Sequence, residues 1–256
     1  MYANDVDISI LEVLQDNEYL HSCVKELDAY ARTIAHEIRT PLAAIQGFAC
    51  LLRDYHGDFD EEERLQAAQA IIDQSKRLCE MVDSLLRLSE VQGSERILLE
   101  PLDMGEIVQR TSDNLHSIIL ESGACIVMPE RWPLALGHAP WVEHIWANYL
   151  SNAIKYGGTP PLVHLGAELS AEGHITFWIR DNGKGLSHYQ QATLFQPFVR
   201  HVDHSIEGHG LGLAIVARIV SRLGGQVGVE SSVNEGSTFT FSLPAAEAVA
   251  ARRRTL

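Results

Sequence analysis

Residues suited to holding phosphate groups recur in the second half of the chain. One stretch, "NYLSNAIKY", covers residues 148–156. Its Asn148, Asn152 and Lys155 fall on one face of a predicted helix. Amide oxygens are neutral ligands that can hold Mg²⁺ against phosphate oxygens, and a lysine can pair with the phosphates. The stretch is typical of a phosphate-bearing ligand site, although an asparagine pair on a helix is more often simply solvated.

Two glycine-rich stretches point to the same chemistry. "DNGKGL" follows a predicted strand and places Asp181 at its end. Gly183 and Gly185 let the backbone there approach a ligand. "GHGLGLAIV", residues 208–216, runs directly into a predicted helix, which is the arrangement for a phosphate at a helix N-terminus. Each stretch alone is more often an ordinary turn, so their joint occurrence carries the interpretation.

A histidine in the first half is predicted to point into water. His36 and Glu37 stand side by side in "TIAHEIRTPLAAI". At about 100° per residue, His36 lies roughly 200° around a helix from Ile34 and Ile38, which belong to an apolar seam. A lone histidine of this kind is usually an ordinary exposed side chain.

Pro41 makes this histidine less ordinary. It removes the N–H that would bond the carbonyl of Glu37, so we expect the helix to bend just past His36. Thr40 lies four residues after His36 and shares its outward face. A threonine here either caps a helix broken by Pro41 or takes part in chemistry at the histidine.

The first ninety residues are predicted to form long helices. Apolar residues recur at alternating steps of three and four over residues 6–38, which is the seam of a coiled coil. Asn17 occupies one seam position, where it either sets the register of a dimer or lies in a frayed, solvated turn. Turn residues over 53–63 then precede a second seam. The second seam consists of Leu65, Ala68, Ile72, Ser75, Cys79, Val82 and Leu86.

These two seams predict an antiparallel helical hairpin. Two helices bury two long apolar stripes poorly, whereas a dimer that forms a four-helix bundle buries both. Residues 91–96, "VQGSER", are predicted to be the linker that leaves the hairpin.

From about Ile97 the pattern changes to α+β. Helices are predicted over residues 103–119, with Asp103 as the cap, 139–157 and 211–225. Strands are predicted over residues 162–169, 174–181, 226–232 and 236–244, the last two forming a closing hairpin.

Composition narrows the classes of protein. The apolar fraction of 46% and charged fraction of 21% are ordinary for a soluble protein. A formal net charge of -14 argues against a nucleic-acid or anionic-membrane surface. We expect no membrane segment, because no apolar run approaches the length of a membrane span. Four widely spaced cysteines suit a reducing cytoplasm.

Five short stretches together resemble a known family. In chain order, "HEIRTP", "NYLSNAIKY", "DNGKGL", "LFQPF" and "GHGLGL" are similar to the H, N, G1, F and G2 boxes of sensor histidine kinases. The resemblance runs from about Leu20 to Leu243. It implies a helical hairpin that forms a dimeric four-helix bundle. An α/β two-layer sandwich follows, an ATPase domain of the type shared with DNA gyrase and a heat-shock chaperone.

The resemblance also implies roles for individual residues. His36 would be the phosphoacceptor, and Glu37 would accept its imidazole proton. Asn152 would coordinate Mg²⁺, with Asn148 beside it, and Asp181 would hydrogen-bond the adenine amino group of ATP. The other residues implied to contact the nucleotide or shape its lid are Lys155, Tyr156, Gly183, Gly185, Phe195, Phe198, Arg200, Gly208, Gly210, Gly212 and Thr238.

The implied function is ATP-dependent autophosphorylation of His36, then transfer to an aspartate of a response-regulator receiver domain. In many such kinases a polar residue at the position of Thr40 also serves dephosphorylation of the regulator. The implied domains are a coiled-coil signalling helix over 1–20, a dimerisation and histidine phosphotransfer domain over 21–92, a catalytic ATP-binding domain over 97–245 and a tail over 246–256.

We therefore expect the excised or soluble core of a homodimeric, cytoplasmic kinase. Two alternatives stay open. One is an ATPase conformational machine of the gyrase or chaperone type, and the other is a phosphotransfer scaffold with an inactive nucleotide domain. The input signal, the cognate regulator and the choice between cis and trans autophosphorylation do not follow from the sequence.

Overall fold

The computed structural model describes residues 32–54, 59–92, 97–170, 173–197, 199 and 210–246. The chain divides into two compact units, with the division between Asp83 and Ser84. The predicted coiled coil before residue 32, the turn at His56-Gly57 and the tail after Ala246 lie outside the described residues. Among the described residues, no helix is long and apolar enough to cross a membrane.

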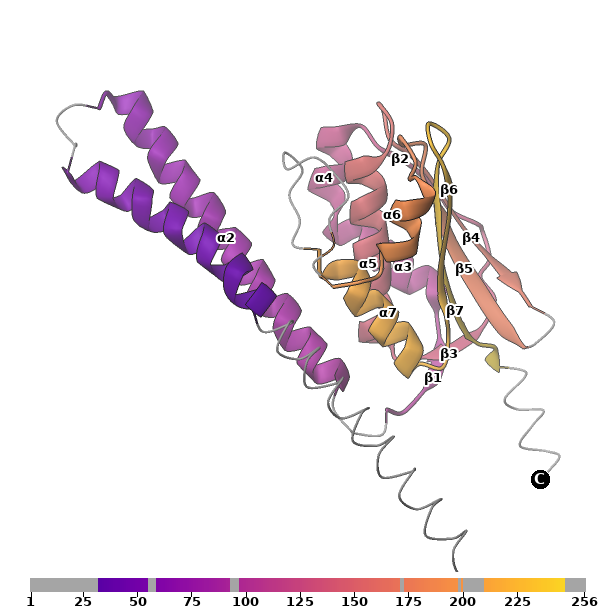
Figure 1. The fold of residues 1–256 in the computed structure, drawn as a ribbon. Coiled ribbons are helices and arrows are strands. Elements are labelled where there is room, and N and C mark those ends of the chain that lie inside the picture. The colour runs from indigo at the N-terminus through magenta and orange to yellow at the C-terminus, as the bar shows by residue number, and fades with distance from the viewer. Residues whose placement is uncertain are drawn as a thin grey trace, which may run out of the picture. The chain divides into compact units, whose positions relative to one another are not determined.

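The first unit contains an antiparallel helical hairpin, as predicted (Figure 1). The first helix of the hairpin covers residues 32–54, and the second, α2, covers Glu61–Gln92, so the division at Asp83 and Ser84 falls within α2. Asp60 and Glu63 form a reciprocal cap at the start of α2. Asp60 Oδ1 accepts from the Glu63 N–H at 2.8 Å, and Glu63 Oε2 accepts from the Asp60 N–H at 3.0 Å. The acidic first turn is therefore both a cap and a favourable partner of the helix dipole.

Pro41 does not end the first helix. Residues 32–54 are helical throughout, and Pro41 itself is buried. The Thr40 hydroxyl donates to the backbone carbonyl of His36, one turn earlier, at 3.2 Å. The possibility that Thr40 caps a helix broken by Pro41 is therefore wrong, because the helix continues.

The second predicted seam is not the face that α2 buries within one chain. Leu65, Ile72, Val82 and Leu86 are between 45% and 65% exposed. Met81, on a different face of α2, is only 1% exposed. A helix in a two-helix hairpin can bury only one stripe, so the apolar seam on α2 is left uncovered in the single chain.

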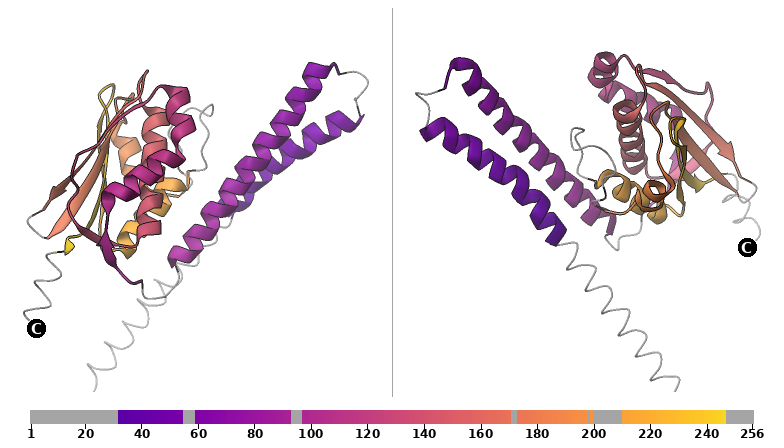
Figure 2. Two further views of the ribbon diagram at one scale, coloured as in Figure 1. Left: turned by 180° about the vertical axis from the view of Figure 1, so that it is seen from behind. Right: turned by 45° about the horizontal axis from the view of Figure 1, so that its top comes forward.

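The second unit is a two-layer sandwich of helices on one face of a sheet (Figures 1 and 2). The helices are α3 (Met104–Asn114), α4 (His116–Ser122), α5 (Ala139–Tyr156), α6 (His188–Thr193) and α7 (Gly212–Arg222). The strands are β1 (Glu100–Leu102), β2 (Cys125–Val127), β3 (Ala135–Gly137), β4 (Leu162–Leu169), β5 (His174–Arg180), β6 (Val227–Ser232) and β7 (Gly236–Pro244).

The main sheet has the strand order β2-β4-β5-β7-β6, and β1 and β3 form a separate antiparallel pair. Only β2 and β4 run parallel in the main sheet. Alternate residues of its central strands are buried, as the period-two pattern predicts. Trp146 of α5 packs edge-on against Phe177 of β5 and Phe241 of β7, and its Nε1 donates to Met104 Sδ at 3.0 Å.

The long elements agree with the sequence predictions, and the short ones do not. The predicted helix over residues 103–119 is two helices, because Leu115 leaves the helical conformation between α3 and α4. Asp103 caps α3 as predicted, accepting from the Glu106 N–H at 3.0 Å. Strands β1, β2 and β3 and helix α6 were not predicted, since three to six residues are too few to show a periodicity.

Candidate functional site

The polar face of α5 lies as the sequence predicts. Asn152 Nδ2 donates to Asn148 Oδ1 at 3.1 Å, one helical turn away. Asn152 Oδ1 has no hydrogen-bond partner among the described residues, so it is free to bind a cation. Lys155, near the end of the helix, is exposed and has no partner in the described part of the chain. This face therefore offers one amide oxygen and one free cation.

The start of α7 approaches the same face. A Cβ on Gly212, the first residue of α7, would overlap the amide nitrogen of Asn148. Gly210, just before, has a positive φ of 67°, which favours glycine. Leu211, the N-cap residue of α7, makes no side-chain cap bond, so among the described residues the first N–H groups of α7 are left for a ligand. The predicted glycine loop therefore lies against the predicted asparagine face.

Asp181, after the end of β5, is a buried carboxyl with one oxygen held by the backbone. Its Oδ1 accepts from the Gly183 N–H at 2.8 Å and from the Ser237 N–H at 3.3 Å. Asp181 Oδ2 has no hydrogen-bond partner among the described residues. Burial raises the pKa of this carboxyl, and the two backbone bonds oppose that rise. Oδ2 is therefore a hydrogen-bond acceptor available to a ligand.

The glycines around Asp181 are required by close backbone contacts. A Cβ on Gly183 would overlap the carbonyl oxygen of Tyr156, and one on Gly185 would overlap that of Ser232. Gly185 also has a positive φ of 67°. These contacts place the Asp181 turn against the C-terminal end of α5, where Tyr156 lies.

Ser237, rather than Thr238, adjoins Asp181. Beyond its bond to Asp181 Oδ1, Ser237 accepts from the Asp181 N–H through its carbonyl at 2.9 Å. Thr238 is next on the strand and faces the opposite side of the sheet, where its hydroxyl accepts from Arg180 Nε at 3.1 Å. The alternation of the buried Phe239 and Phe241 on β7 places Ser237 on the helix-covered face, a signal that the sequence contained.

Asn182 is a second residue that sequence reasoning missed. Its Oδ1 accepts from the Gly158 N–H at 2.9 Å and from the Leu162 N–H at 2.8 Å. Its Nδ2 donates to the Pro160 carbonyl at 3.2 Å. One side chain therefore closes the whole loop between α5 and β4.

The segment that leads to the predicted lid is anchored to β6. Gln191 of α6 donates through Nε2 to the carbonyls of Leu186 and Ser231, at 3.0 and 2.9 Å. Ser187 and Gln190 form a capping box at the start of this helix. Phe195 follows α6 and is half-buried. The predicted lid residues Phe198, Arg200 and Gly208 lie outside the described residues.

His36 lies on the other unit and is highly exposed. Its side chain is 76% exposed, as the helical geometry predicts. Glu37 Oε1 lies 3.9 Å from His36 Nδ1, which is too far for a hydrogen bond. Because the carboxylate faces Nδ1, the other ring nitrogen, Nε2, is left for a reaction partner.

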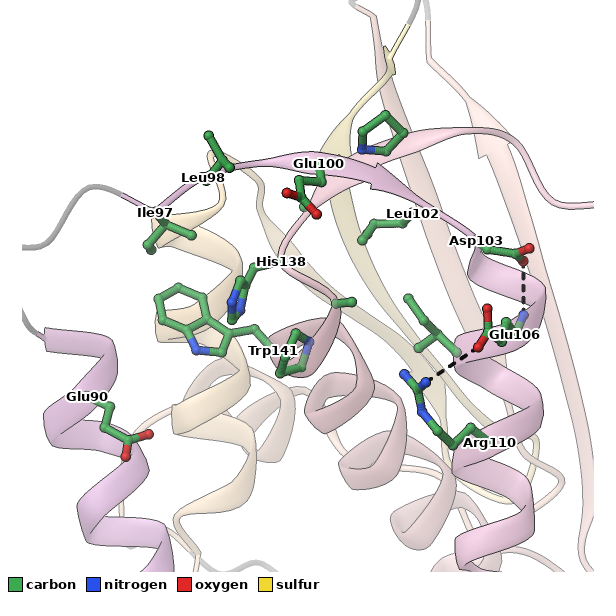
Figure 3. Close-up of a pocket in the computed structure, with 15 residues that line it drawn as sticks. Glu90, Ile97, Leu98, Glu100, Leu102, Asp103, Glu106, Arg110, His138 and Trp141 are labelled. Atoms are coloured by element: carbon green, nitrogen blue, oxygen red, sulfur yellow. Dashed lines mark hydrogen bonds and ion pairs between the residues drawn. The ribbon is translucent and has the colours of Figure 1, made fainter.

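A separate cavity of about 650 Å³ involves β1, α3 and the start of α5 (Figure 3). His138 and Trp141 pack edge-on there, and His138 Nδ1 is buried without a hydrogen-bond partner. Glu106 and Arg110 form an ion pair on α3 at 3.7 Å. None of the predicted site residues lines this cavity, so it is not the predicted nucleotide site.

Two protein families match the two units. Residues 26–94 match the His Kinase A (phospho-acceptor) domain. Residues 137–247 match the family of histidine kinase-, DNA gyrase B- and HSP90-like ATPases. The two matches occur in the order that the sequence resemblance implied.

Individual relatives agree with these matches. Cyanobacterial phytochrome B of Nostoc sp. is 31% identical over 91% of this chain, but the chain spans only 31% of that relative's length. The structure of full-length ShkA in complex with AMPPNP is 28% identical, with a TM-score of 0.62, and covers 84% of this chain and 45% of ShkA. Histidine kinase ThkA, resolved with the response regulator protein TrrA, is 18% identical and has the same fold, with a TM-score of 0.71 over 92% of this chain and 66% of the other.

The chain therefore belongs to the sensor histidine kinases. It combines a phosphoacceptor domain with a domain of the histidine kinase, gyrase and HSP90 ATPase type.

Proposed function

We propose that this chain transfers the γ-phosphoryl group of ATP to its own His36 and then to an aspartate of a response-regulator receiver domain. The observation that carries the proposal is the state of His36. It is a 76% exposed imidazole with a carboxylate beside Nδ1, on a helix matched to a phosphoacceptor domain. An ordinary surface histidine would be expected neither to have a carboxylate beside it nor to lie in a phosphoacceptor domain.

His36 and Glu37 divide the chemistry of the first step. The lone pair of His36 Nε2 attacks the γ-phosphorus, and the bond from that phosphorus to the β,γ-bridging oxygen breaks as ADP leaves. As positive charge develops on the ring, the Glu37 carboxylate closes from 3.9 Å to hydrogen-bond distance and takes the proton from Nδ1. In the second step a receiver aspartate attacks the phosphorus and the N–P bond breaks. The proton held by Glu37 returns to Nδ1, so His36 leaves as a neutral ring.

The second unit would hold the nucleotide. Asp181 Oδ2 would accept from the adenine amino group, and Lys155 and the open N–H groups of α7 would face the phosphates. Asn152 Oδ1, with Asn148 beside it, fits a hard cation that also needs oxygens from phosphate, as Mg²⁺ does. Bound Mg²⁺ would neutralise charge on the transferring phosphoryl group.

We assign the lid residues from the resemblance to sensor histidine kinases. In the described part, Phe195 would anchor the lid and Gly210 would allow its turn into α7. Phe198, Arg200 and Gly208 complete the proposed lid. We propose that Ser237, in place of Thr238, holds the Asp181 carboxylate, because the Ser237 N–H donates to Asp181 Oδ1.

The uncovered apolar seam on α2 supports a homodimer. Leu65, Ile72, Val82 and Leu86 form a stripe that water contacts in the single chain. A second hairpin would cover that stripe and complete a four-helix bundle. The domain limits proposed from the sequence, at residues 21–92 and 97–245, then separate a dimerisation domain from a catalytic domain.

Labelling with γ-labelled ATP tests this function. The protein should acquire label that is lost in acid and retained in alkali, which is the behaviour of phosphohistidine. ATP hydrolysis without labelling would instead support a conformational ATPase, and nucleotide-independent phosphotransfer would support a scaffold.

A further inference from the structure

We propose that Asn182 is a positioning residue that sets the separation between the adenine end and the phosphate end of the nucleotide site. The inference rests on the proposed function, since it assumes that Asp181 reads the base and α5 faces the phosphates. It assigns a role to a side chain that would not itself touch the nucleotide.

The first step is the set of contacts that Asn182 makes. Its amide bonds three backbone groups of the loop between α5 and β4, namely the N–H groups of Gly158 and Leu162 and the carbonyl of Pro160. The distances are 2.9, 2.8 and 3.2 Å. Both the oxygen and the nitrogen of the amide are used, so no other side chain of similar size reproduces the set.

The second step is the close fit of the two segments. A Cβ on Gly158 would lie 2.7 Å from Asn182 Nδ2, and a Cβ on Gly183 would overlap the carbonyl oxygen of Tyr156. The loop after α5 and the turn after β5 therefore interlock where neither has a side chain. Asn182 joins them at this point, with glycine on both sides of the contact.

The two segments that Asn182 joins continue from opposite ends of the proposed nucleotide site. The loop continues directly from α5, which holds Asn148, Asn152 and Lys155. The turn continues directly from β5 and begins with Asp181. These groups are not neighbours in the sequence, so the bonds of Asn182 tie the base-reading carboxylate to the phosphate-facing helix. A ligand that touches both ends needs that separation, whereas a ligand that touches one end does not.

Measuring the dissociation constants of ATP with Mg²⁺ and of AMP tests whether Asn182 positions the two ends of the site or only stabilises the fold. The ratio of the two dissociation constants measures how much the added phosphates contribute. Asn182→Ala should reduce that contribution by about tenfold while changing AMP affinity by less than about threefold, because AMP depends mostly on the adenine end. A general loss of folded protein lowers the binding-competent fraction for both nucleotides alike and leaves the ratio unchanged.

Two further variants sharpen the test. Asn182→Asp keeps acceptors for the N–H groups of Gly158 and Leu162 but loses the donor to Pro160, so its ratio should fall between wild type and Asn182→Ala. This variant also serves if Asn182→Ala does not fold. Asn114→Ala removes an amide of the same size that bonds Glu143 at 3.5 Å, away from the site, and should leave the ratio at the wild-type value.

An unchanged ratio in both Asn182 variants, with wild-type protein that binds ATP, would overturn this inference and leave the proposed function standing. Wild-type protein that binds neither nucleotide would overturn the proposed function and the inference with it.

Discussion

Gly212 lies so close to Asn148 that no side chain fits between the start of α7 and the amide of that asparagine. The contact joins two motifs that lie more than sixty residues apart in the chain. It explains why a glycine begins this helix, where its conformational cost would otherwise be unfavourable. The same contact brings the start of α7 to the asparagine face of α5.

Gly212→Ala should weaken nucleotide binding. The added methyl group must push Asn148 or the start of α7 away, and such overpacking costs about 1–3 kcal/mol. We expect at least a tenfold or so loss of affinity in a titration with a fluorescent nucleotide. Gly105→Ala is the matched control in the same unit. Its Cβ would meet Asp103 Oδ1 and Trp132 Cδ1 at 3.4 Å, an ordinary contact, and binding should be unchanged. Equal nucleotide affinities for the two variants would show that the start of α7 is not part of the nucleotide site.

Asp181→Asn should weaken ATP binding by roughly ten- to a hundred-fold, since a mismatched buried polar group costs about 1–3 kcal/mol. The asparagine can keep its oxygen at the position of Oδ1, where Gly183 and Ser237 donate, so the turn should survive. Its amide nitrogen would then replace Oδ2 and present a donor to the adenine amino group. Nucleotide titration measures the loss, and Asp113→Asn on α3 controls for charge. Unchanged affinity would place the adenine site elsewhere.

The sequence predicted the long elements because they leave regular patterns. The alternation of β5 and β7, the seam on the first helix and the glycine loop before α7 are of this kind. It did not distinguish Ser237 from Thr238, because a motif match ignores which face of a strand a residue occupies. The strand alternation alone would have shown that Ser237, and not Thr238, faces the helix-covered side.

Asn182 and the uncovered seam on α2 were harder to foresee. The three bonds of Asn182 depend on the path of a loop twenty residues earlier, which no local pattern specifies. The seam on α2 has the right period, but its spacing does not tell whether it meets the first helix or a second copy. The exposure of Leu65 and Leu86 in the single chain shows that the seam does not meet the first helix, which leaves a second copy.

Thr40→Ala should keep autophosphorylation of His36 and lose dephosphorylation of the regulator. The Thr40 hydroxyl donates to the His36 carbonyl at 3.2 Å, and its lone pairs stay available to orient a water molecule. The measurement is the decay of phosphorylated regulator in the presence of ADP and each protein. Thr40→Ser keeps the hydroxyl and should retain the activity. If decay is the same with wild type and Thr40→Ala, then Thr40 is structural or the kinase has no phosphatase activity.

Acid should destabilise the second unit through His144. Burial lowers the pKa of this imidazole from 6.5 to about 4, and its Nε2 has no hydrogen-bond partner within the described ranges. As the pH falls, His144 therefore binds a proton near pH 6.5 in the unfolded chain but only near pH 4 in the folded chain. Stability is unaffected above pH 6.5 and falls by about 3 kcal/mol between those two values.

His144→Leu should remove that part of the acid sensitivity. Urea unfolding at pH 7 and at pH 4.5 measures the free energy of unfolding for each protein. The difference between the two pH values should be smaller for the variant, since other groups titrate equally in both. The same difference in wild type and variant would show that His144 takes no part.

The most direct test of the account is labelling of His36 itself. Wild-type protein and His36→Gln are incubated with γ-labelled ATP and Mg²⁺, and the protein-bound label and the nucleotide affinity of each are measured. We predict acid-labile, alkali-stable label on wild type, no label on His36→Gln, and nearly equal affinities, because the nucleotide residues lie in the other unit. Label on His36→Gln at the wild-type level would contradict the assignment of the phosphoacceptor.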